Sequence, residues 1–201
     1  AMADVGGNTT LTLTGGTITN DAYGGAKGRE NIAAGVGGNV LVDLNGTSGT
    51  TTDSDGNTVI TSNPVDKTSK GCVVKRVFGA NNVNGTPKGH VLVHVHGTQN
   101  KDLANIGTKS TAANVYDVDY VFGGGNASDY VPTDVKQSTE VIIDGCDLSS
   151  IEEVYGGGYG AATPGTSVLI RGTKIINNVF GGGYGAGDNN PGANVGYLTN
   201  K

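Results

Sequence analysis

The sequence lacks several features on which common classes of protein depend. It has no tryptophan, only 5% aromatic residues, and no apolar run long enough to cross a bilayer. Its apolar content of 35% is too low to fill a wide globular core, so the chain must either be disordered or bury a narrow core. We therefore expect no membrane insertion in this segment.

Positive charge and cysteine are also scarce. Lysine and arginine number 13 against 18 aspartates and glutamates, and the basic residues are scattered. A nucleic-acid-binding protein needs a basic stripe to replace phosphate counterions, so we expect no nucleic-acid partner. The two cysteines, Cys72 and Cys146, are too few for a disulfide scaffold and lack the CxxC spacing of zinc sites. We predict two free thiols.

Glycine, by contrast, is abundant at 36 residues, and much of it follows short apolar segments in a fixed order. Five alternating segments each run into a glycine turn: LTLTGGT from Leu11, VLVDLNGT from Val40, VLVHVHGT from Val91, VIIDGC from Val141 and VLIRGT from Val168. After each comes a small or aliphatic residue, an aromatic residue and then glycine. Period-2 alternation predicts strands, and units repeated in series predict a solenoid.

This pattern predicts an all-β fold, a single-stranded right-handed parallel β-helix of about five coils. We expect one domain over residues 1–201, which we interpret as a fragment of a longer protein because its last residues carry no capping pattern. Two polar, turn-rich segments, residues 48–70 and 99–120, are expected to be loops inserted at one corner of the coil.

Anchoring each first strand on its following glycine sorts the side chains into columns. The predicted inward columns are Leu13, Leu44, Val95, Ile143 and Ile170, and Leu11, Val42, Val93, Val141 and Val168. The predicted outward ladders are Thr14, Asn45, His96, Asp144 and Arg171, and Thr12, Asp43, His94, Ile142 and Leu169.

The outward ladders contain the candidate catalytic residues Asp43, His94, His96, Asp144 and Arg171. Such a cluster could bind an anionic sugar or assist proton abstraction, and His94 and His96 with a carboxylate could hold a divalent metal. The structural alternative is a solvated face on which opposite charges pair and set the strand register. A flat ladder would become a site only if an insert folded over it.

A column of aromatic residues, Tyr23, Phe78, Phe122, Tyr155 and Phe180, has two interpretations. Inside, it would pack adjacent coils together, and outside, it would offer a platform for sugar rings. We expect the preceding valines to point inward and the aromatic rings to be partly covered by the inserts. Tyr23, Tyr155, Tyr159 and Tyr184 are the candidate glycan-binding residues.

Three short motifs suggest ions but fit poorly. GGGYGAGD at residues 181–188 has its aspartate one place too late for a calcium roll. DSDGN, with Asp53 and Asp55, resembles the start of a calcium loop without its closing glutamate, so a turn is favoured. GGGYG lacks the helix with lysine that follows a phosphate loop. We expect no cofactor, with calcium as the open alternative.

In its strand motifs and in the stretch VYGGGYGA at residues 154–161, the chain resembles the glycine-rich repeats of large secreted or outer-surface proteins of gut anaerobic bacteria. These resemble right-handed parallel β-helices of the filamentous-haemagglutinin or adhesin type. The resemblance covers residues 9–186 and implies an extracellular or bacterial cell-surface location. It rests on shape-forming residues and transfers no functional residue.

Three functions follow as hypotheses. The first is a non-catalytic, adhesin-like segment that contacts further repeats end to end and a host or microbial surface glycan or protein through its inserts. The second is a polysaccharide lyase or glycoside hydrolase built on the outward ladder, which is an argument from fold analogy. The third is a glycan-binding module that uses exposed tyrosine and threonine ladders.

Overall fold

The computed structural model describes residues 3–52, 54, 58–64, 71–98, 116–185 and 194–195, and it is all-β with parallel sheets. The first sheet contains β1 (Thr9–Leu13), β3 (Val40–Leu44), β7 (Val91–Val95), β9 (Thr139–Asp144) and β11 (Thr166–Gly172). The second contains β2 (Thr17–Tyr23), β6 (Val73–Phe78), β8 (Val118–Phe122), β10 (Ser150–Tyr155) and β12 (Ile175–Phe180). No helix in this described part is long and apolar enough to cross a membrane.

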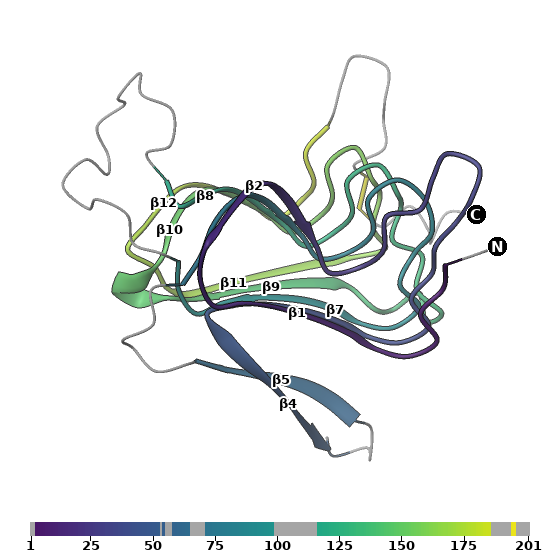
Figure 1. The fold of residues 1–201 in the computed structure, drawn as a ribbon, viewed down its shortest axis with the longest axis horizontal. Helices are drawn as coiled ribbons and strands as arrows, with labels where there is room; N and C mark the ends of the chain where they lie inside the picture. The colour runs from purple at the N-terminus through teal and green to yellow at the C-terminus, as the bar shows by residue number, and fades with distance from the viewer. Residues whose placement is uncertain are drawn as a thin grey trace.

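The chain passes alternately between the two sheets, so each successive pair of strands adds one strand to each (Figure 1). We call such a pair a level, from level 1 (β1 and β2) to level 5 (β11 and β12). Each strand pairs in parallel with the equivalent strand of the next level. All ten strands coincide with the predicted alternating segments or aromatic-glycine segments.

The core lies between the two sheets and is narrow. In the first sheet, the two predicted inward columns pair in register: Leu11, Val42, Val93, Val141 and Val168, and Leu13, Leu44, Val95, Ile143 and Ile170. Nine of these ten residues belong to the core cluster or pack against it, whereas Ile170, in the last strand of the sheet, is 37% exposed. The second sheet contributes Val77, Val121 and Val154, which are fully buried in the same cluster. Period-2 alternation accounts for this, since every second side chain of each strand meets the opposite sheet.

The aromatic column lies on the other face of the second sheet, and its five rings are in register. Successive rings stack with centroids 4.8–4.9 Å apart. The prediction that the preceding valines point inward is confirmed for Val77, Val121 and Val154, whereas Val179 is 46% exposed. We expected the inserts to cover these rings, but two of the residues that cover them lie in neither insert. The Tyr159 ring meets the Phe122 ring edge-on with centroids 5.8 Å apart, and the Arg76 guanidinium lies 5.3 Å from the Phe78 ring centroid.

The first predicted insert is not a simple loop. It contains an antiparallel hairpin of β4 (Gly46–Thr52) and β5 (Thr58–Pro64), which starts directly after β3 and projects away from the first sheet (Figure 1). Most of the second insert, residues 99–115, lies outside the described residues, and its last residues, 118–120, belong to β8. The four threonines of β4 favour a strand there, since β-branched residues have high strand propensity.

The two cysteines are free thiols, as predicted. Cys72 is buried before β6, and Cys146 is exposed at the start of the short 3-10 helix η2 (Cys146–Leu148) between β9 and β10. Cys146 has a positive φ of 44°, which is unusual for a residue with a side chain.

Candidate functional site

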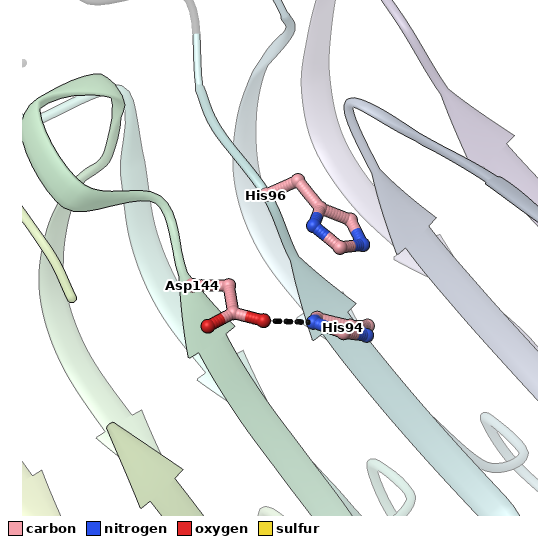
Figure 2. A group of neighbouring side chains, drawn as sticks. All are labelled: His94, His96 and Asp144. Atoms are coloured by element: carbon pink, nitrogen blue, oxygen red, sulfur yellow. Dashed lines mark hydrogen bonds and ion pairs between the residues drawn. The ribbon is translucent and has the colours of Figure 1, made fainter. Parts of the chain in front are cut away.

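Polar side chains gather on the outer face of the first sheet, where neighbouring strands end. Asp43 and His94 are register partners in β3 and β7, His96 directly follows β7, and Asp144 ends β9. Figure 2 shows Asp144 and His94 facing each other across adjacent strands, with His96 beside them. Parallel strands bring their carboxyl ends to the same edge, so the register assembles this cluster from distant parts of the sequence.

We expected this ladder to face solvent, and that expectation is wrong for its central members. Asp43 is 0% exposed, His94 5% and His96 6%. The hairpin is one reason, because it brings the Ser62 hydroxyl of β5 to 2.7 Å from Nε2 of His96. Asp144 and Arg171 remain on the open side, so the cluster is closed towards the hairpin and accessible from the other direction.

Asp144 joins the buried part of the cluster to its exposed part. Its Oδ2 lies 2.9 Å from Nε2 of His94, and its two oxygens accept hydrogen bonds from Nε and Nη2 of Arg171. The register between β9 and β11 shifts between Ile170 and Gly172, so Asp144 pairs with Gly172 rather than with Arg171 as predicted. Arg171 is thus the extra residue of a β-bulge, and its side chain still reaches the carboxylate.

The two imidazoles are held neutral by their surroundings. Their rings stack with centroids 3.9 Å apart. Burial lowers the pKa of His94, although Asp144 opposes the shift. Burial and the neighbouring His94 lower the pKa of His96 to about 4. Both rings therefore carry a free lone pair at neutral pH, as a metal ligand or a general base requires.

The pKa of Asp144 is lowered, whereas burial alone would raise the pKa of a carboxyl group. Burial tends to raise it, but hydrogen bonds from Arg171 and His94 outweigh burial and lower the pKa. Asp144 is therefore ionised at neutral pH and already paired with a cation.

Asp43 is the least satisfied group in the cluster. No donor among the described residues has hydrogen-bond geometry to either carboxylate oxygen. Oδ1 lies 3.8 Å from Nε2 of His96. Burial raises the pKa of Asp43 to about 6, and the nearby Ser62 hydroxyl weakens that shift. An ionised carboxylate without donors is costly to bury, so this position calls for explanation.

Gly46 is required at the junction between β3 and the hairpin. A Cβ atom there would lie 1.9 Å from Oδ1 of Asp43 and 2.6 Å from Cδ2 of His96. The preceding Asn45 has a left-handed φ of 58° and turns the chain out of the sheet. Local sequence thus places the hairpin directly against the polar cluster.

A pocket of about 400 Å³ opens beside this cluster. Its lining residues are Asn45, Ser62, Pro64, His94, His96, Asp144, Gly145, Cys146, Leu148 and Arg171. A larger hollow of about 540 Å³ lies elsewhere, but Asp129, its only ionisable lining residue, accepts a hydrogen bond from the Ala162 backbone at 2.8 Å. The smaller pocket therefore combines space with a cluster of ionisable side chains.

The geometry does not form a Ser-His-Asp triad. In a triad, the carboxylate holds one imidazole nitrogen while the hydroxyl faces the other. Here both Ser62 and Asp43 lie on the Nε2 side of His96. Metal ligation is better supported, because one donor atom from each of His94, His96 and Asp144 lies within 4.8 Å of the others. Asp53 and Asp55, the other two residues named as metal candidates, lie outside the described residues.

The structure does not bring the candidate tyrosines to this pocket. Tyr155 is 4% exposed, and its hydroxyl donates to Glu153 on the second sheet. Tyr23 donates to Asp21 at 2.9 Å, and Tyr159 stacks on Tyr184 with centroids 5.0 Å apart. Of these four candidates, only Tyr184 is exposed, at 39%.

Three contributors to the pocket, Ser62, Pro64 and Leu148, were not predicted. Pro64 ends the hairpin strand β5, which also contains Ser62. Both belong to an insert without a repeat equivalent, and Leu148 belongs to the short helix η2, so column alignment could not place any of the three. The sequence offered one indication of the hairpin residues, namely the expectation that an insert could fold over the outward ladder.

Comparison with known proteins does not add to this geometry: no protein-family model matches the chain, and neither a curated protein nor a solved structure was found to be similar to it.

Proposed function

We propose that the chain is a right-handed single-stranded parallel β-helix that serves as a non-catalytic, adhesin-like segment of a secreted or cell-surface protein. In this proposal the stacked levels form a stalk that continues end to end, and the hairpin side faces a surface glycan or protein partner. The observation that carries the proposal is the regular stacking of levels that ends in an open apolar edge.

The open edge is at level 5. Among the described residues, no strand pairs with the outer edges of β11 and β12. Val179 is 46% exposed and Phe180 42%, whereas their register partners Val154 and Tyr155 are buried. A further level of the same kind would cover these side chains and satisfy the free backbone groups.

The chemistry of the pocket also favours a structural or binding role over catalysis. Asp144 is ionised and held by Arg171. Among the described residues, His96, which contacts the Ser62 hydroxyl, has no carboxylate paired with its other ring nitrogen. The aromatic rings that would form a sugar platform stack mainly on one another. Ser62, His96 and Asp43 are not arranged as a nucleophile, a base and an orienting group.

Sedimentation velocity over a range of concentrations tests the proposal. The unmodified chain should form elongated, concentration-dependent oligomers, and Val179→Lys should shift it to monomers because a charge would be buried at the edge. Val135→Lys is the matched control, since Val135 is 52% exposed away from the strands. Circular dichroism confirms that each variant folds.

Two results would overturn the proposal. One is a chain that stays monomeric at every concentration whether or not Val179 is replaced, which would remove the end-to-end contact. The other is release of unsaturated products from uronic-acid polysaccharides that disappears in Asp144→Ala, which would establish the lyase alternative.

A further inference from the structure

We infer that His94, His96 and Asp144 form a binding site for one divalent transition metal of the zinc class, with the remaining coordination position open to the 400 Å³ pocket. This site goes beyond the proposed structural role and does not depend on it. Two imidazoles and one carboxylate are a ligand set that suits zinc, whereas calcium and magnesium prefer oxygen ligands alone.

The backbone already positions the three ligands. His94 and His96 are two residues apart, so they project from the same face of the chain at β7, and Asp144 comes from the adjacent β9. Nε2 of His94 is 2.9 Å from Oδ2 of Asp144. The widest separation of the three donor atoms is 4.8 Å, so zinc bonds of about 2.0–2.1 Å require only a small inward movement of the side chains.

The ring of His96 is oriented for ligation through its other nitrogen. Its Nε2 contacts Ser62 at 2.7 Å and faces Asp43 at 3.8 Å. In Figure 2, one nitrogen of His96 lies on the side of Asp144 and the other on the opposite side. Metal-bound histidines commonly donate their second N–H to a hydroxyl or carboxylate, and Ser62 with Asp43 supplies that arrangement.

The buried carboxylate of Asp43 is a second, independent indication. It is 0% exposed and lacks a hydrogen-bond donor among the described residues, yet it lies against one of the proposed ligands. A metal on His96 would polarise the imidazole N–H towards Asp43 and place positive charge near the carboxylate. A metal site therefore accounts for the burial of the Asp43 carboxylate, which apolar packing does not explain.

Arg171 is the competing cation. It holds both oxygens of Asp144, and 52% of its side chain is exposed, so it can leave the carboxylate at little packing cost. Removing it should free Asp144 for the metal, and Arg171→Gln should therefore bind zinc more tightly than the unmodified chain. If the Arg171–Asp144 ion pair were purely structural, removing Arg171 would not increase the affinity for zinc.

The experiment is isothermal titration of zinc into the full chain, prepared without a polyhistidine tag and stripped with EDTA. We expect one equivalent to bind, with affinity reduced about 10-fold or more in His94→Ala and His96→Ala. His90→Ala is the matched control, because His90 is the remaining histidine of three and pairs with Glu140 at 3.4 Å instead. Its affinity should be unchanged.

A second measurement needs no variant and so does not depend on their folding. Heteronuclear NMR of the imidazole nitrogens should show zinc-induced shifts at His94 and His96 but not at His90. Absence of saturable binding, equal shifts at all three histidines, or binding that is lost in Cys146→Ser but kept in His94→Ala would each overturn the inference.

Discussion

Among single residues, Asp43 imposes the clearest energetic cost on the fold. Its carboxyl group is buried between the sheet and the hairpin, and Gly46 is the residue that lets the hairpin approach it. Burial raises the pKa of Asp43 to about 6 from the ordinary value of 3.8. A raised folded-state pKa means that the native state holds the proton more tightly than the unfolded chain does.

Replacing this carboxyl group should therefore stabilise the metal-free protein at neutral pH. The contribution of protonated Asp43 is fully present below about pH 3.8 and is lost as pH rises through about 6. In EDTA at pH 7.5, Asp43→Asn should raise the melting temperature by roughly 2–4 °C for each kcal/mol of burial cost removed. Calorimetric melts at pH 7.5 and 4.5 should show a smaller gain at the lower pH.

Asp144→Asn provides a control with the opposite sign. Arg171 and His94 lower the pKa of Asp144 despite its burial, so its stabilising contribution is present above about pH 3.8 and lost at lower pH. This substitution should lower the melting temperature at pH 7.5. A pH-independent gain from Asp43→Asn, or a loss, would contradict our account of the buried carboxylate.

Among the elements, the strands of the second sheet are held together on both faces. One face contributes valines to the core, and the other carries the stacked aromatic column. Phe122 in β8 stacks between Phe78 and Tyr155 and is 1% exposed. Within the described part of the chain, Phe180 in β12 has one stacking partner, Tyr155, and is 42% exposed. Identical side chains in one column thus have different packing.

This difference predicts unequal costs for the same substitution. Phe122→Ala should destabilise the protein by about 3–5 kcal/mol, because it leaves a cavity inside the stack. Phe180→Ala should cost on the order of 1 kcal/mol, because much of that ring is already in water. Urea unfolding monitored by circular dichroism measures both values. Equal costs would mean that the column contributes little beyond strand propensity.

Across the whole molecule, stability should vary along the direction in which the levels stack. Among the described strands, levels 2 to 4 have a neighbour on each side, whereas each terminal level has a neighbour on one side only. The strands β3 and β7 are buried at every residue, while β11 is exposed at several. In such an arrangement each level is stabilised mainly by its nearest neighbours.

Hydrogen exchange should reveal this gradient. Amides of β11 and β12 should exchange at least about 10-fold faster than those of β7 and β8, because level 5 can open without disrupting the rest. Mass spectrometry of peptides at low protein concentration measures the rates. At concentrations where the end-to-end oligomer forms, the protection of β12 should rise, and uniform protection under all conditions would contradict both the gradient and the contact.

Much of the fold follows from the sequence alone, because its determinants are local. Alternation with period 2 fixes which side chains share a face, and the glycine after each strand aligns one unit with the next. The ten residues predicted to face inward are therefore in the predicted register, and all but the exposed Ile170 lie in the core cluster or pack against it. His94, His96 and Asp144 were predicted to lie close together by the same alignment, and the structure places them in one cluster.

What the sequence could not decide depends on residues outside the repeat. The hairpin has no equivalent in other levels, so only the tertiary structure brings Ser62 to His96 and contributes to burying Asp43 on a face that alternation assigns to solvent. The β-bulge at Arg171 likewise pairs Asp144 with Gly172 in place of the predicted Arg171, whose side chain still reaches the Asp144 carboxylate. Strand register was determined by the sequence because a local period repeats along the chain, whereas the chemistry of the pocket was decided by non-local packing that occurs once.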